Sequence, residues 1–141
     1  MPKNSPETIV VDAWALVALV FKQEPAATAI RDLFTAAAST SRALHISWIN
    51  LGEVYYTVAR RKGVAAADEV LGDILKLGMQ VHEPSKNDIL AAARLKAAYR
   101  LSYADAFAVA LAEKLGAVVY TGDPEIVALA TTIQVMALSR V

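Results

Sequence analysis

Four carboxylates in this sequence lie where they could meet in one site. They are Asp12, Glu53, Asp105 and Asp123. Asp12 and Asp123 each follow a short apolar run, as expected just beyond the carboxyl end of a buried parallel strand. Four carboxylates in one cleft cannot all stay charged without a cation, and hard ions such as Mg²⁺ prefer oxygen ligands. The pattern therefore predicts a metal site.

Three of these acids also have an ordinary explanation as helix caps. Asp12 precedes a predicted helix, and Asp123 is followed by Pro124, which is typical of a cap before a proline in the first helical position. Asp105 lies three residues after Ser102, in a pattern that resembles a capping box. Taken singly, each of the three is explained by capping alone.

Glu53 has no such explanation, because it lies about two turns inside a predicted helix. The residues of that helix with core spacing are Leu51, Val54, Tyr55 and Val58. Glu53 falls on the opposite face, whose other residues are Ile49, Gly52, Tyr56 and Arg60. That face is too apolar for a typical solvated surface, so the periodicity favours a cleft wall.

The elements that must position these acids follow from apolar runs and helical periodicity. The predicted strands cover about 8–11, 44–46, 79–82, 117–120 and 133–137. The predicted helices cover about 13–23, 26–38, 48–62, 64–77, 86–99 and 103–115, with a short one from Pro124. Strands that alternate with helices predict an α/β fold with a parallel sheet covered on both faces.

Composition limits the class of protein. The chain has 141 residues, the size of one domain, and equal numbers of basic and acidic residues, so a nucleic-acid ligand would need a local basic patch. The absence of cysteine excludes a disulfide framework and thiolate metal sites. No apolar run is long enough to span a membrane, and residues 1–7 lack the apolar core of a signal peptide, so we expect a cytoplasmic protein.

Four stretches, taken together, resemble PIN-domain proteins, and within them the toxins of VapBC toxin–antitoxin pairs. The stretches are 9–20, 47–55, 101–112 and 118–123. The resemblance implies a single PIN-like domain over 1–141, a three-layer α/β/α sandwich with a roughly five-stranded, mainly parallel sheet. It places the family's acidic quartet on the four carboxylates above, its small polar residue on Thr121 and its helix-start serine on Ser47. Trp14 is a departure, since many members carry a small polar residue nearby.

The resemblance also implies a function. The expected activity is that of a metal-dependent endoribonuclease with Mg²⁺ or Mn²⁺, acting as a toxin that inhibits translation and growth when free of its antitoxin. The expected partners are RNA, a VapB-like antitoxin and a second copy of the chain in a homodimer. Our hypothesis makes Asp12 and Asp105 the main metal ligands, with Glu53 and Asp123 binding through water or holding a second ion. Thr121 would position a water or a carboxylate.

Other side chains have weaker functional readings. Three consecutive basic residues end the Glu53 helix and could bind RNA or complement the helix dipole: Arg60, Arg61 and Lys62. A second candidate patch contains Arg94, Lys96 and Arg100. His45 and His82 are interpreted as lone structural histidines. The aromatic residues Trp14, Trp48, Tyr55, Tyr56 and Phe107 are assigned to the core or an interface, and Trp14 to a partner surface.

Other classes of protein fit less well. A phosphoacceptor receiver needs an acid beside Asp12, where Val11 and Ala13 stand, and a haloacid-dehalogenase-type phosphatase needs an aspartate where Trp14 stands. A PIN-like module that only binds would be expected to have lost part of the acidic quartet. A PIN nuclease outside a toxin–antitoxin system, acting in RNA processing, stays open as an alternative.

Overall fold

The computed structural model describes residues 7–40 and 42–141, so most of the N-terminal stretch examined for a signal peptide lies outside it. The strands are β1 (Ile9–Val11), β2 (Leu44–Ser47), β3 (Gln80–His82), β4 (Val118–Thr121) and β5 (Val135–Ala137). The helices are α1 (Ala13–Val20), α2 (Ala26–Thr40), α3 (Trp48–Lys62), α4 (Val64–Leu75), α5 (Lys86–Ala98), α6 (Tyr103–Leu115) and α7 (Pro124–Val127). Every predicted element is present.

The five strands form one sheet in the order β3-β2-β1-β4-β5, and every neighbouring pair is parallel. The central strand β1 is wholly buried, which explains why it reads as an unbroken apolar run. After β1 the chain moves to β2 on one side, and β4 returns on the other. The strand order therefore reverses between β1 and β4, and open α/β sheets bind their ligands at such a point.

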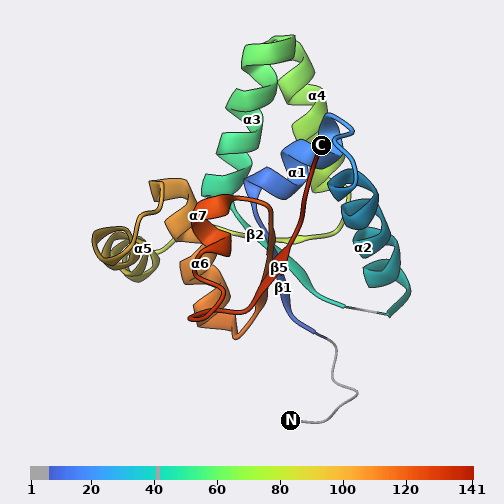
Figure 1. Cartoon of the computed structure of the whole chain (residues 1–141). Helices are drawn as coiled ribbons and strands as arrows, with labels where there is room; N and C mark the ends of the chain where they lie inside the picture. The colour runs from blue at the N-terminus through green and yellow to red at the C-terminus, as the bar shows by residue number, and fades with distance from the viewer. Residues whose placement is uncertain (1–6, 41) are drawn as a thin grey trace.

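Helices cover both faces of this sheet, which confirms the three-layer α/β/α sandwich (Figure 1). Alternate residues of β1 face opposite sides, as strand geometry requires. Ile9 and Val11 join a core with residues of α1 to α4, whereas Val10 joins a second core with residues of α5 and α6. No helix in the described ranges has the length and apolarity that crossing a membrane would need.

The helix ends follow the local sequence closely. Ser47 caps α3 as predicted, since its Oγ accepts the Ile49 N–H at 3.1 Å. The capping box predicted at Ser102 is wrong in one half. Its Oγ accepts the Asp105 N–H at 3.1 Å without the return bond from the Asp105 carboxylate, whereas Ser85 at the start of α5 is part of a complete reciprocal box. The carboxylate of Asp105 is instead surrounded by other acids.

Candidate metal centre

The candidate site lies at the carboxyl ends of β1 and β4. These strands are parallel neighbours, with Val11 in register with Tyr120. Asp12 follows β1 directly, and Asp123 lies two residues beyond Thr121, the last residue of β4. Their carboxylates therefore start from the ends of adjacent strands, at the point where the strand order reverses.

Asp12 caps α1 with one carboxylate oxygen, and its other carboxylate oxygen has no hydrogen-bond partner. Its side chain is almost completely buried, and Oδ1 accepts the Ala15 N–H at 2.9 Å. Oδ2 is buried without a hydrogen-bond partner, which is costly for a carboxylate unless a cation or proton satisfies it. Burial is the main cause that raises the pKa of Asp12 to about 7. The Thr121 hydroxyl and the Ala15 N–H oppose this rise, and the charges of Asp105 and Asp123 add to it.

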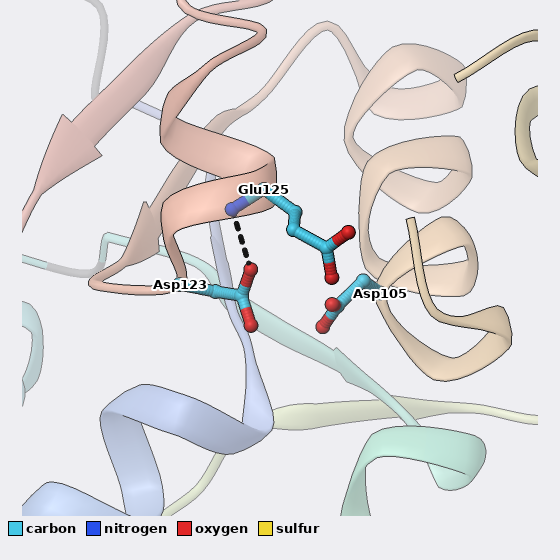
Figure 2. Close-up of side chains that lie close together, drawn as sticks. All are labelled: Asp105, Asp123 and Glu125. Carbon is cyan, nitrogen blue, oxygen red and sulfur yellow. Dashed lines mark hydrogen bonds between the residues drawn. The ribbon is translucent and has the colours of Figure 1, made fainter. Parts of the chain in front are cut away.

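Asp105, Asp123 and Glu125 form the tightest group of acids. One carboxylate oxygen of each lies within 4.8 Å of those of the other two, and Figure 2 shows the three side chains converging. Asp123 also caps α7, since its Oδ1 accepts the Glu125 N–H at 2.8 Å. Burial, and next the charge of Asp123, raise the pKa of Asp105 to about 7, against the effect of the Ser102 hydroxyl. Such a group favours bound cations.

Glu53 completes the group from α3. Its side chain is half-buried, and its Oε1 has no hydrogen-bond partner. Burial, and then the charge of Asp123, raise its pKa above the usual range. Of the four predicted acids, Asp105 and Asp123 belong to the group within 4.8 Å, and Asp12 and Glu53 lie near enough for the charge of Asp123 to raise their pKa values.

Two polar residues hold the elements that carry these acids. The Thr121 side chain is fully buried, and its Oγ1 accepts the Asp123 N–H at 2.9 Å, so it fixes the turn before Asp123. Asn50 was not predicted as a site residue. Its Nδ2 donates to the Ala104 carbonyl at 3.0 Å and so joins α3 to the start of α6, beside Asp105.

Glu125 is the acid that sequence reasoning missed. It stands in the first turn of α7, where an acidic residue is usually explained by the helix dipole. The available signal was its position two residues after Asp123, across Pro124. A cap residue and the second residue of the following helix lie at the same helix end, so their side chains can face one neighbour.

The predicted basic patch lies away from this cluster. Arg60 is seven residues beyond Glu53, about 10 Å farther along the α3 axis. Its guanidinium lies 4.9 Å from the ring centroid of Tyr56, and that of Arg61 lies 4.5 Å from the ring centroid of Phe21. The end of α3 is therefore an exposed basic and aromatic surface outside the acidic cluster.

Some of the residues assigned to structure are placed differently from the prediction. His45 and His82 are not lone, because Nδ1 of His45 lies 2.8 Å from Nε2 of His82 in a hydrogen bond between β2 and β3. Phe107 is buried as predicted, whereas Tyr56 is 48% exposed and Trp48 37% exposed. Trp48 and Tyr56 therefore lie on the surface of α3, where the prediction had left open whether they belong to the core or to an interface.

The donor set fits a hard divalent cation. It consists of carboxylates with one buried hydroxyl, and buried oxygens of Asp12 and Glu53 lack partners. Across residues 7–40 and 42–141, the salt bridges formed are Arg31–Glu24 and Lys114–Asp88, so no basic side chain neutralises the cluster. A metal ion would supply both the missing charge and the missing contacts.

Comparison with known proteins gives a consistent result. The family model described as PIN domain matches residues 9–131. Among solved structures, the sarcin-ricin loop cleaving toxin VapC20 of Mycobacterium tuberculosis is similar, with 22% identity, a TM-score of 0.71, and coverage of 86% of this chain and 94% of that one. DNA-bound VapBC from Salmonella typhimurium has 18% identity, a TM-score of 0.71, and coverage of 93% and 98%.

A third similar structure is a toxin–antitoxin complex from Klebsiella pneumoniae. It has 16% identity, a TM-score of 0.68, and coverage of 95% of this chain and 100% of that one. A search of curated proteins finds no match to the chain. At these identities the solved structures show a shared fold, and that fold extends over nearly the whole chain.

Proposed function

Because this chain belongs to the PIN-domain family, we propose that it is a metal-dependent endoribonuclease and the toxin of a toxin–antitoxin pair. The observation that carries the proposal is the cluster of buried and half-buried acids without basic partners, at the point between β1 and β4 where the strand order reverses. The toxin role is supported by similar structures described as a toxin and as toxin–antitoxin complexes. Free of its antitoxin, the protein inhibits translation and growth.

In this proposal the acids hold Mg²⁺ or Mn²⁺. Asp12 and Asp105 are the main ligands, while Glu53 and Asp123 bind through water or hold a second ion. When bound, such an ion activates water and offsets the negative charge of a phosphodiester. Thr121 keeps Asp123 in place through the 2.9 Å hydrogen bond from the Asp123 N–H. Carboxylates suffice for this task, which agrees with a cluster free of histidine and cysteine.

The remaining parts of the proposal concern RNA and proteins. The basic residues at the end of α3, Arg60, Arg61 and Lys62, contact RNA phosphates while the scissile bond lies in the acidic cleft. A VapB-like antitoxin blocks that cleft with a basic side chain, which would supply the positive charge that the cluster lacks. The toxin itself is a homodimer. An intact set of acids supports catalysis over a module that only binds.

The test is the Asp12→Asn variant. Asparagine is also a good N-cap, so α1 keeps its cap while the cluster loses a charge. We expect metal-dependent cleavage of RNA to fall by roughly 100-fold or more, since even partners behind a ligand cost about 10–100-fold. Induced expression should arrest growth with the wild-type chain and not with this variant. The exposed Asp32 on α2 provides the matched control, Asp32→Asn, which should keep full activity. Full cleavage by purified Asp12→Asn protein would sink the assignment.

A further inference from the structure

The turn between Thr121 and Asp123 is packed against an aromatic ring. Gly122, the middle residue, has no side chain, and a Cβ built there would overlap Cη2 and Cζ2 of the Trp14 indole and lie 2.6 Å from Cε2. Gly122 is not among the glycines with positive φ. Space, and not backbone conformation, therefore requires glycine at this position.

Trp14 connects two of the strand ends that carry acids. It stands in the first turn of α1, two residues after Asp12, and its ring covers the turn that leads to Asp123. The same turn is held from inside by Thr121 Oγ1, which accepts the Asp123 N–H. The position of the Asp123 carboxylate relative to Asp12 therefore depends on one indole–glycine contact as well as on the β1–β4 ladder.

The C-terminal segment in turn holds the Trp14 ring. The Arg140 guanidinium lies 4.8 Å from the ring centroid, and its Nη1 donates to Gln23 Oε1 at 2.8 Å. The main chain beside it is fixed as well. The Ala26 N–H donates to the Ser139 carbonyl at 2.9 Å, and the Leu138 N–H donates to the Thr121 carbonyl at 2.8 Å. Gly122, Trp14 and Arg140 thus form one packed unit, which we call the indole clamp.

The indole clamp can hold the Asp123 turn in place against repulsion between the acids. Asp123 lies among other acids, so when no cation is bound, repulsion between like charges favours movement of the Asp123 turn away from them. A rigid ring against the turn resists this movement before any ion binds. Ligands held in place in advance bind a metal more tightly, because less order must be imposed on binding.

We propose that Trp14 is a positioning residue that sets the metal affinity of the acidic cluster by fixing the Thr121–Gly122–Asp123 turn. This inference rests on the proposed metal site. It adds that Trp14, which is not itself a ligand, holds one of the ligands in position. It also gives Trp14 a role inside the molecule, in place of the partner surface predicted from the sequence.

The experiment is calorimetric titration of Mn²⁺ into the full chain without RNA. Trp14→Ala should weaken the Kd by about 10-fold or more, the scale seen when a group that orients a metal ligand is removed. Trp14→Phe, which keeps a ring against the glycine, should recover part of the loss. Phe34→Ala removes a partly buried ring on α2 that lies with Leu44 and Gly78 near the starts of β2 and β3, at the opposite edge of the sheet. This variant should lower the unfolding temperature but leave the Kd unchanged.

A double-mutant cycle makes the test specific to the contact. Gly122→Ala places a methyl group into the indole and should also weaken the Kd, whereas the Trp14→Ala/Gly122→Ala double variant should bind better than the sum of the two losses predicts. An unchanged Kd in folded Trp14→Ala protein, or simple additivity in the cycle, would overturn the inference. Wild-type protein that binds Mn²⁺ but cleaves no RNA would refute only the proposed nuclease function.

Discussion

At the scale of single residues, one carboxylate can cap a helix with one oxygen and leave the other oxygen available for a metal ion. Asp12 uses Oδ1 to cap α1 and leaves Oδ2 buried without a partner, so the cap itself directs the second oxygen into the cluster. Asp123 caps α7 with Oδ1 and still lies within reach of Asp105. This explains why Asp12, Asp123 and Asp105 could not be identified one at a time from the sequence. Their shared order with mid-helix Glu53 was the informative signal.

Glu125 shows the limit of that signal. An acid in the first turn of a short helix is common and needs no function, so the position of Glu125 two residues after Asp123 did not by itself mark it as a site residue. Only the three-dimensional placement of α7 against α6 brings its carboxylate to Asp105 and Asp123 (Figure 2). The close approach of separate elements is the part of the site that local patterns could not supply.

The placement of Glu125 leads to a residue-scale prediction. Glu125→Gln should weaken Mn²⁺ binding in calorimetry by about 10-fold, because it removes one of three clustered negative charges while keeping the shape of the side chain. The matched control is Glu113→Gln, an exposed acid near the other end of α6, which should bind like the wild-type protein. Equal Kd values for both variants would exclude Glu125 from the metal site.

At the scale of elements, the sequence predicted every helix and strand but not every contact between them. Helical periodicity and apolar runs are local, so α1 to α7 and the five strands could be found. The hydrogen bond between His45 and His82 could not be found. It depends on β2 pairing with β3 in the register that sets His45 opposite Gln80 and Ser47 opposite His82. A register of this kind is a property of two distant segments.

The α3 helix supports a prediction about RNA. If its C-terminal end binds phosphate, replacing Arg60, Arg61 and Lys62 with glutamine should weaken binding of single-stranded RNA at low salt. The slope of log affinity against log salt should shrink by about 0.7 for each phosphate group that the variant no longer neutralises. Fluorescence anisotropy in the Asp12→Asn background measures binding without cleavage.

The second basic patch on and after α5 is the control for this experiment. Arg94, Lys96 and Arg100 can be replaced in the same way, and Lys96 already donates to the Leu101 carbonyl at 3.1 Å. We expect the salt slope of this variant to match that of the parent protein. The assignment to α3 is wrong if the α5 variant, and not the α3 variant, has the smaller slope.

At the scale of the whole molecule, equal numbers of acidic and basic residues conceal an uneven distribution. The formal net charge is zero, yet three acids lie within 4.8 Å of one another at one edge of the sheet, with Asp12 and Glu53 near them, and none has a basic partner among the described residues. An anion such as RNA is repelled by such a cluster until a cation changes the local sign. In the proposed function, metal binding would therefore govern both the charge that the substrate meets and the stability of the fold around the cluster.

The pH dependence of stability follows from the pKa values of these acids. The ordinary aspartate value is 3.8, and in the folded chain Asp12 and Asp105 have values of about 7. Between those values the folded state holds protons that the unfolded state has released, so the free energy of unfolding falls as the pH rises from about 4 to 7. Above pH 7 the loss is complete, because both states are then ionised.

The Asp12→Asn variant isolates this effect, since other carboxylates such as Asp88 have lowered pKa values and act in the opposite direction. With a chelator present, its unfolding temperature should equal that of the wild-type chain near pH 4. At pH 8 it should exceed the wild-type value by roughly 4 °C for each kcal/mol of relieved repulsion. Addition of Mg²⁺ at pH 8 should stabilise the wild-type chain more than the variant. Identical melting curves from pH 4 to pH 8 would show that Asp12 carries no buried charge, and the proposed metal site would then lose one of its two main ligands.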